Sequence, residues 1–198
     1  VRTLSAFLPL DLARTAVVTV PAGHESPIAT LLESAFPGNH ITLVPGGVER
    51  QDSVRNALSA LRSDTALVAI HDAARPFVTP AVVEASFEAA ATYGAATVAV
   101  PAIDTVLVSD GEGFLSDTPD RSTIWYCQTP QTFQVAIIRE AHETAQRKSF
   151  QGTDDATLVR RCGQPVKLVP GDFTNLKVTT PTDMTIAETF IEKKLVCV

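Results

Sequence analysis

The chain has 198 residues, of which 45% are hydrophobic and 19% charged, and its formal net charge at pH 7 is −6. These values predict one soluble globular domain with a sizeable core and exclude a disordered chain. A negative charge without a long basic run argues against a nucleic-acid partner, and no apolar stretch approaches the ~20 residues of a membrane-spanning helix. The three cysteines, Cys127, Cys162 and Cys197, lack metal-ligand spacing, which indicates reduced thiols in a cytoplasmic protein.

The first half of the chain alternates strands with helices. Apolar runs rich in β-branched residues predict buried strands at residues 15–20, 41–44, 65–70 and 95–100. Residues 3–8 have the pattern of the end of a helix, Ser26 and Pro27 that of a helix start, and further helices are expected from residue 52 or 53 and over 80–93. This alternation predicts an α/β fold with a mostly parallel sheet covered by helices on both faces.

The pattern changes after residue 100. Residues 104–109 alternate polar and apolar side chains, residues 110–113 form a turn, and an extended run returns through 123–128. A hairpin without a covering layer is marginally stable, so this arm, at about 103–128, is expected to pack on a second subunit. Helices at 134–147, within 154–162 and after Pro181, and a strand at 166–169, complete a single domain over residues 1–198.

A charged turn follows the strand at 65–70. Asp72 and Arg75 stand at the carboxyl end of that strand, where ligands gather in open α/β sheets. The carboxylate could hold a divalent cation against a phosphate, and the arginine could bind a second anion. The alternative is structural: Asp72 caps a turn and Arg75 forms a surface ion pair. His71 is interpreted as a structural hydrogen-bonding residue, because no second histidine or cysteine lies at metal-ligand spacing.

Three further motifs have both a functional and a structural interpretation. Gly46 and Gly47 precede a helix and could offer backbone N–H groups to a phosphate or a base edge, or could simply form a tight turn. Ser53 and Thr153 both have the sequence context of helix caps. Lys177 follows a strand end, where it could reach a phosphate or remain an ordinary exposed lysine.

Taken together and in order, the motifs resemble the 2-C-methyl-D-erythritol 4-phosphate cytidylyltransferase family. The resemblance covers nearly the whole chain. It implies a Rossmann-like fold of the nucleotide-diphospho-sugar transferase type with an inserted β-hairpin arm. The matching segments are Pro45-Gly-Gly-Val-Glu-Arg-Gln-Asp-Ser-Val54, His71-Asp-Ala-Ala-Arg-Pro-Phe77, Val100-Pro-Ala-Ile-Asp-Thr105, Gln128-Thr-Pro-Gln-Thr-Phe133, Thr153-Asp-Asp-Ala156 and Gly171-Asp-Phe-Thr-Asn-Leu-Lys-Val-Thr-Thr-Pro181.

The resemblance implies transfer of CMP from CTP to methylerythritol phosphate, with release of pyrophosphate. It assigns Asp72 and Lys177 to catalysis, with Mg²⁺ on Asp72 and phosphate charge neutralised by Lys177. The nucleotide would be bound by Gly46, Gly47, Val48, Ser53 and Asp72, and of these Gly47, Val48 and Ser53 would line the cytosine pocket. The acceptor would be bound by Arg75, Thr105, Arg121, Thr129 and Thr153, of which Thr105 and Arg121 would come from the arm of the partner in a homodimer.

The resembling family begins with a strand and a glycine-rich loop that wraps the CTP triphosphate. Residues 3–7 match the helix that follows this segment, so the loop is absent from residues 1–198. We expect its omission from the sequence rather than its deletion, because deletion would expose the core. Two alternatives stay open: a ribitol 5-phosphate (pentitol phosphate) cytidylyltransferase with the same motifs, and, if the loop is truly missing, a non-catalytic nucleotide-binding dimer.

Overall fold

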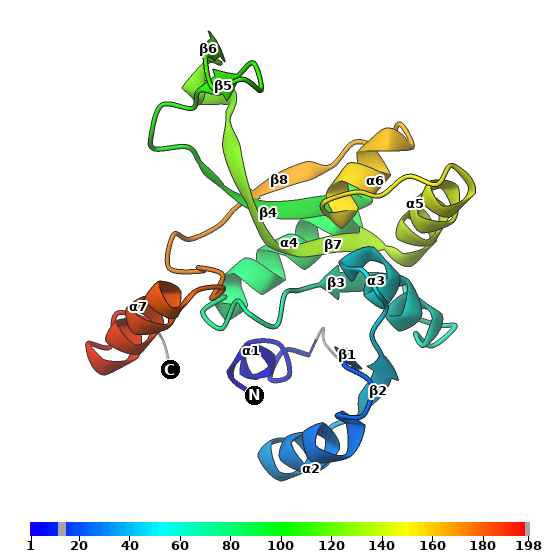
Figure 1. The fold of residues 1–198 in the computed structure, drawn as a ribbon. Helices are drawn as coiled ribbons and strands as arrows, with labels where there is room; N and C mark the ends of the chain where they lie inside the picture. Colours follow the sequence, from blue (N-terminus) through cyan, green and yellow to red (C-terminus); the bar gives the residue numbers. More distant parts are fainter. Residues whose placement is uncertain (12–14, 197–198) are drawn as a thin grey trace.

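The computed structural model describes residues 1–11 and 15–196 (Figure 1). The prediction of a reduced thiol at Cys197 lies outside these residues. Cys127 and Cys162 are both free thiols, as predicted. Within the described part of the chain, no helix combines the length and the apolar character needed to cross a membrane.

The central sheet contains four strands in the order β3–β7–β4–β8. Their bounds are Leu67–Ile70 for β3, Trp125–Gln134 for β7, Ala95–Pro101 for β4 and Lys167–Pro170 for β8. Strand β8 runs parallel to β4, whereas β7 is antiparallel to both β3 and β4. The α/β fold is confirmed, with a mixed sheet. β7 is antiparallel because it follows β4 without a crossover helix, which a parallel connection requires.

Helices cover both faces of this sheet. On one face, α4 (Pro80–Tyr93) packs Ala90 against Ala96, Val98 and Val169 of the strands. On the other face lie α3 (Arg50–Ser59), α5 (Val135–Arg147) and α6 (Asp155–Arg161), whose apolar side chains enclose the fully buried Phe133. Successive residues of a strand point to opposite faces, so a strand covered twice is apolar throughout. This explains why every side chain of β4 from Ala95 to Val100 is buried, and why Thr97 is the one polar residue among them.

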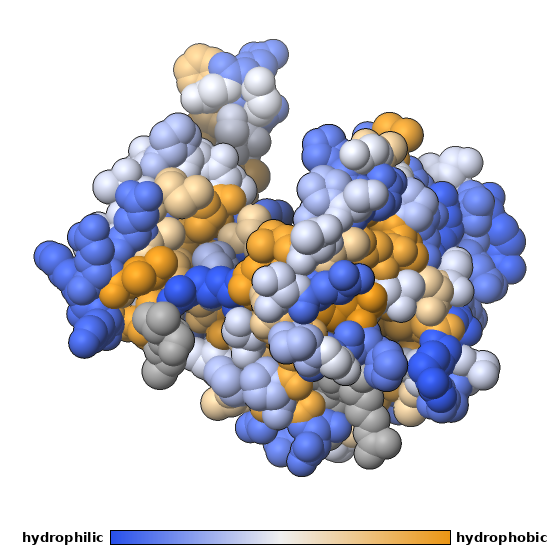
Figure 2. All heavy atoms as spheres, turned by 90° about the horizontal axis from the view of Figure 1, so that it is seen from below, coloured by the Kyte–Doolittle hydropathy of each residue, from blue (hydrophilic) through white to orange (hydrophobic). Residues whose placement is uncertain are grey.

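A second, smaller sheet pairs β1 (Ala16–Val20) with β2 (Ile41–Pro45) in parallel. It is separate from the central sheet, and a cavity of about 1050 Å³ lies between β1 and β3. Apolar side chains such as Val18, Leu58 and Leu67 line most of it, and Arg50, Ser53, His71 and Asp72 also contribute to its wall. Figure 2 shows the molecule from below, with hydrophobic side chains in the middle of this face and hydrophilic ones around them.

The remaining helices flank the two sheets. They are α1 (Arg2–Ser5), α2 (Glu25–Ala35) and α7 (Pro181–Glu192). Helix α2 begins at Glu25 with His24 as N-cap, so the predicted start, with Ser26 as N-cap, was wrong by two residues. Helix α3 begins at Arg50, not at residue 52 or 53, because the backbone N–H of Glu49 donates to Asp52 Oδ2 at 3.3 Å and closes the first turn.

The arm projects from the central sheet, away from the helices (Figure 1). Its tip is the antiparallel pair β5 (Val108–Ser109) and β6 (Leu115–Asp117), followed by a short 3-10 turn, Arg121–Thr123. The predicted pairing of 104–109 with 123–128 was wrong. The returning run belongs instead to β7, where Cys127 pairs with Ala99 of β4. Strand β4 pairs with β7 over a longer edge than β5 and β6 provide in the arm.

Candidate functional site

Asp72 lies two residues beyond the end of β3, surrounded by positive charge. Its Oδ2 accepts Lys177 Nζ at 2.9 Å and its Oδ1 accepts Arg50 Nε at 3.2 Å. Arg75 Nε lies 3.8 Å from Oδ2. Burial alone would raise the pKa of Asp72, but Lys177 and Arg50 outweigh it and hold that pKa below its ordinary value. The carboxylate is therefore ionised and is compensated by three cations.

Lys177 reaches Asp72 because the loop after β8 is tied to the turn that carries Asp72. The backbone N–H of Val178 donates to Ala74 O at 2.8 Å. The buried side chain of Asn175 donates to Thr129 O at 2.9 Å, which fastens the same loop to β7. Lys177 is 42% exposed, so the ammonium faces both Asp72 and solvent. Lys177 is thus held in an ion pair by a fixed loop, and it is not an isolated surface lysine.

His71 has the structural role that the sequence indicated. Burial lowers the pKa of His71 to about 4, so the imidazole is neutral at physiological pH. Nε2 lies 3.1 Å from Arg75 O, a pure acceptor, so Nε2 carries the proton. Nδ1 then accepts the Thr129 hydroxyl at 3.1 Å, and Thr129 Oγ1 in turn accepts the Asp72 backbone N–H at 3.1 Å. Thr129 thus lies beside the turn and fixes its backbone.

The guanidinium of Arg75 is held by backbone carbonyls. Nη1 donates to Asn175 O at 2.7 Å and Nη2 to Cys127 O at 3.4 Å. Burial lowers the pKa of Arg75, partly offset by Asp72, and the group stays charged near neutral pH. The side chain of Arg75 is therefore partly buried and is held in one orientation by these hydrogen bonds. The structural alternative is right about an ion pair, which Arg75 forms with Asp72, but wrong about the surface, since only 13% of the Arg75 side chain is exposed.

Gly46 and Gly47 form the turn between β2 and α3. Gly47 N donates to Ser53 Oγ at 2.9 Å, and a side chain at Gly47 would collide with Asp52. Ser53 lies in α3 itself and donates to Glu49 O at 3.2 Å, so it does not cap the helix. Val48 is 95% exposed at the head of this turn. The turn thus presents an open backbone surface beside the wall of the cavity that Ser53 and Asp72 both line.

The remaining predicted site residues lie farther out in this single chain. Thr105 and Arg121 are exposed on the arm, where Arg121 Nη1 donates to Ile103 O at 2.8 Å. Thr153 is exposed just before α6 and does not cap it, because Asp154 Oδ1 accepts the Thr157 N–H at 2.7 Å. The structure therefore gathers Asp72, Arg75, Thr129 and Lys177, while these three residues face solvent.

Sequence reasoning missed a buried network next to the cluster. Arg50 Nη1 donates to Asp155 Oδ2 at 2.7 Å, and Asp155 Oδ1 accepts His142 Nε2 at 2.9 Å. Burial lowers the pKa of Arg50, but Asp155 and Asp72 together raise it above its ordinary value. Arg50 lies inside the quoted motif at 45–54, which is the one signal that could have drawn attention to it.

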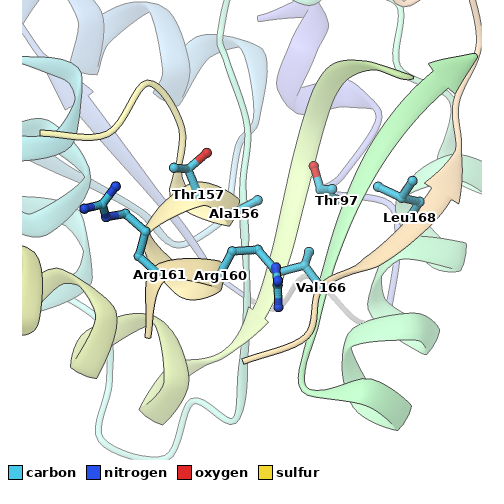
Figure 3. A pocket seen from close by; sticks show the side chains of 7 residues that line it. All are labelled: Thr97, Ala156, Thr157, Arg160, Arg161, Val166 and Leu168. Atoms are coloured by element: carbon cyan, nitrogen blue, oxygen red, sulfur yellow. The ribbon is translucent and has the colours of Figure 1, made fainter. Parts of the chain in front are cut away.

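A second cavity, of about 440 Å³, lies between α6 and the strands β4 and β8. In Figure 3, Arg160 extends from α6 toward Val166, Thr97 and Leu168 lie on the strand side, and Arg161 extends from α6 away from the strands. Arg161 stacks on Phe150 at 3.8 Å from the ring centroid, and Arg160 donates to Gln164 O at 3.2 Å. None of the predicted site residues lines this cavity.

The α/β fold, with charged side chains gathered near the carboxyl end of β3, has the arrangement in which enzymes with open α/β sheets bind their ligands. Residues 1–193 match the family model described as IspD: 2-C-methyl-D-erythritol 4-phosphate cytidylyltransferase. The chain therefore belongs to the 2-C-methyl-D-erythritol 4-phosphate cytidylyltransferase family, whose members are nucleotidyltransferases.

Relatives of known name agree with this assignment. The 2-C-methyl-D-erythritol 4-phosphate cytidylyltransferase of Pelotomaculum thermopropionicum is 45% identical over 192 residues, which are 96% of this chain and 81% of that protein. The crystal structure of the Thermus thermophilus enzyme of that name superimposes with a TM-score of 0.82 at 37% identity, covering 96% of this chain and 87% of the other. The Anaerococcus prevotii 4-diphosphocytidyl-2C-methyl-D-erythritol synthase reaches a TM-score of 0.91 at 27% identity, with the same coverage.

Proposed function

We propose that the cluster around Asp72 is where this chain carries out its family's reaction, transfer of CMP from CTP to 2-C-methyl-D-erythritol 4-phosphate. One observation carries the proposal: an ionised carboxylate and three cations converge at the carboxyl end of β3, beside the open Gly46-Gly47 turn. Such a cluster can hold a triphosphate and an attacking phosphate together despite their mutual repulsion. The same reaction supplies a precursor for isoprenoid biosynthesis.

In this reaction an oxygen of the acceptor phosphate attacks the α-phosphorus of CTP. A new oxygen–phosphorus bond forms while the bond from the α-phosphorus to the bridging oxygen breaks, and its electron pair leaves with pyrophosphate. The protein contributes position and charge rather than covalent chemistry. Lys177 is long and 42% exposed, so it can exchange Asp72 for a phosphate oxygen. Arg75 is fixed by two carbonyls and offers a stationary positive charge to the acceptor phosphate.

Asp72 is suited to bind magnesium, because Mg²⁺ prefers carboxylate oxygens as ligands. No group of three or more His, Cys, Asp or Glu side chains among residues 1–11 and 15–196 could hold a metal by itself. Mg²⁺ suits such a site, because it keeps several waters and binds through one or two carboxylates plus substrate phosphates. When bound there, Mg²⁺ neutralises phosphate charge. Asp72 would hold it, while Arg50 keeps one carboxylate oxygen oriented.

The Gly46-Gly47 turn is assigned to the nucleotide base. A side chain at position 47 would collide with Asp52, so the turn requires glycine there. The hydrogen bond from Gly47 N to Ser53 Oγ holds the backbone of the turn. Val48, which is 95% exposed, can cover a planar ring. Exposed backbone N–H and C=O groups at such a turn can hydrogen-bond the edge of a base. We therefore assign Gly46, Gly47, Val48 and Ser53 to the cytosine pocket.

The arm is assigned to a homodimer interface in which Thr105 and Arg121 complete the partner's acceptor site. Support comes from its exposed apolar side chains, among them Phe114 at 70% and Leu115 at 63%. Replacing both by serine should shift sedimentation from dimer to monomer, whereas Leu168→Ser, on β8, should not. Arg121→Ala should raise KM for the acceptor and leave CTP binding nearly unchanged. An unaltered sedimentation coefficient, or equal loss of both substrates, would overturn this assignment.

The acceptor is tested by measuring pyrophosphate release with CTP and either methylerythritol phosphate or ribitol 5-phosphate. The names of the relatives above support methylerythritol phosphate. We expect at least a roughly 100-fold preference in kcat/KM, because a site built to hydrogen-bond particular hydroxyls rejects analogues that leave those groups unpaired. A preference for ribitol 5-phosphate would overturn the acceptor assignment. Nucleotide binding without pyrophosphate release would instead favour a non-catalytic dimer.

We also propose that the protein is located in the cytoplasm. The free thiols of Cys127 and Cys162 support this proposal, because cysteines stay reduced in that compartment.

A further inference from the structure

Arg50 joins the cluster to a carboxylate deep in the core. Its guanidinium donates from Nε to Asp72 Oδ1 and from Nη1 to Asp155 Oδ2, at 3.2 Å and 2.7 Å. A guanidinium is planar and rigid, so fixing one edge fixes the direction of the other. The shorter bond goes to Asp155, whose side chain is 1% exposed. The orientation of Arg50 is therefore set from the core and passed outward to Asp72.

Asp155 is itself immobilised. Its second oxygen, Oδ1, accepts His142 Nε2 at 2.9 Å. Its backbone N–H and that of Ala156 donate to Gln131 Oε1 at 2.9 and 3.1 Å, which ties the start of α6 to β7. Both carboxylate oxygens are occupied, and the backbone is fixed on the sheet. The carboxylate has no freedom to rotate without breaking a buried hydrogen bond.

The side chain of His142 has no polar contact other than Asp155 among the described residues. It lies in α5 with 3% of its side chain exposed, and its buried Nδ1 has no hydrogen-bond partner there. A buried polar pair gives little net stability compared with apolar residues of similar volume. The pair formed by His142 and Asp155 is therefore better explained by its effect on the orientation of Arg50 than by a contribution to stability.

We propose that Asp155 and His142 are positioning residues for Asp72 and act on it through Arg50. This inference rests on the proposed role of Asp72. The chain of contacts keeps Arg50 on Oδ1 of Asp72, while the exposed Lys177 occupies Oδ2. When substrates bind, Lys177 can leave for phosphate, and Arg50 stays because Asp155 holds it. Oδ2 is then the oxygen of Asp72 that becomes free.

The test is a double-mutant comparison of Asp155→Asn in the natural background and in Arg50→Met. In the natural background, kcat/KM for CTP should fall by roughly 10–100-fold, the usual cost of losing a residue that orients a ligand-holding group. In Arg50→Met the same change should cost less than about twofold, because the residue that transmits the effect is gone. An equal loss in both backgrounds would overturn the proposal.

Two controls separate positioning from folding. Ala145→Gly destabilises α5 about one turn from His142 without touching the network, and it should lower the melting temperature while leaving kcat/KM unchanged. His142→Gln keeps an N–H donor toward Asp155 and should retain most activity, whereas His142→Leu should not. If the two His142 variants behave alike, the hydrogen bond has no positioning role. Should Asp155→Asn fail to fold, His142→Leu replaces it in the double-mutant comparison.

A readout without substrates keeps this inference distinct from the proposed function. The ¹H–¹⁵N signal of Arg50 Nε–H, assigned with Arg50→Lys, should be sharp in the natural chain and broadened in Asp155→Asn. An unchanged signal would overturn the positioning role even in an active enzyme. Absence of pyrophosphate release from the natural chain, with the expected change in signal, would instead count against the proposed function.

Discussion

Asp72 collects its neighbours from distant parts of the chain. Arg50 stands at the start of α3, Thr129 in β7 and Lys177 in the loop after β8. Each of these side chains makes a polar contact with Asp72 or with its backbone. At the scale of single residues, the site is a carboxylate held in place by its partners before any substrate arrives. Such preorganisation avoids the cost of arranging charges during the reaction.

The lysine on Asp72 should matter for turnover and little for folding. Lys177→Met should reduce kcat by roughly 100-fold, the usual loss when one transition-state contact is removed. The melting temperature should change by only a few degrees, since the side chain is 42% exposed. Lys167→Met is the matched control, because Lys167 lies over the ring of Tyr93 and away from the cluster. Equal kinetic losses in the two variants would contradict a specific role for Lys177.

The neutral imidazole of His71 makes stability depend on pH. Its pKa is about 4 in the folded chain and about 6.5 when unfolded, so the unfolded state binds more protons between these values. Stability is therefore complete above pH 6.5 and is lost as the pH falls toward 4, by up to roughly 3 kcal/mol. NMR of the imidazole nitrogens should show a neutral ring with the proton on Nε2 at about pH 5.5, which lies between the two pKa values. Titration near the ordinary pKa of about 6.5 would contradict this.

Among the helices and strands, the bounds set by local sequence signals were predicted better than the pairing of strands that are distant in the sequence. Helix α4 was predicted with its observed bounds because its signals are adjacent in sequence: Thr79 caps it, Pro80 opens it and Gly94 ends it with a φ of 86°. The start of α3 was missed because Glu49 and Asp52 do not have the usual cap sequence. The path of β7 depends on pairing with β3 and β4, which no local pattern specifies.

The role of Gly94 in ending α4 can be tested by substitution. Gly94→Ala should lower the free energy of unfolding by about 2–3 kcal/mol, because its φ is unfavourable for alanine and the new Cβ would lie 2.7 Å from Ile137 Cδ1. Gly163→Ala is matched in φ, at 83°, but meets no atom within 4 Å, so it should cost only about 1 kcal/mol. Urea unfolding measures both. Equal losses would show that crowding at Ile137 contributes nothing.

At the scale of the whole molecule, the order of short motifs predicted more than any one of them. Asp72, Arg75, Thr129 and Lys177 come from three motifs, and they meet because the turn after β3 and the loop after β8 lie side by side. The Arg50–Asp155 pair could not be predicted, because it joins residues that are 105 positions apart through side chains alone. The roles of Thr105, Arg121 and Thr153 stay predictions, since these residues lie on the surface of the single chain.

The central claim is that Asp72 serves catalysis rather than the stability of its turn. The most direct test measures pyrophosphate release from CTP and methylerythritol phosphate across Mg²⁺ concentrations, with thermal unfolding of the same samples. Asp72→Asn should lower kcat by roughly 100-fold or more and weaken the dependence on Mg²⁺, while the melting temperature shifts by a few degrees. A variant that keeps its turnover and loses mainly its melting temperature would contradict the account.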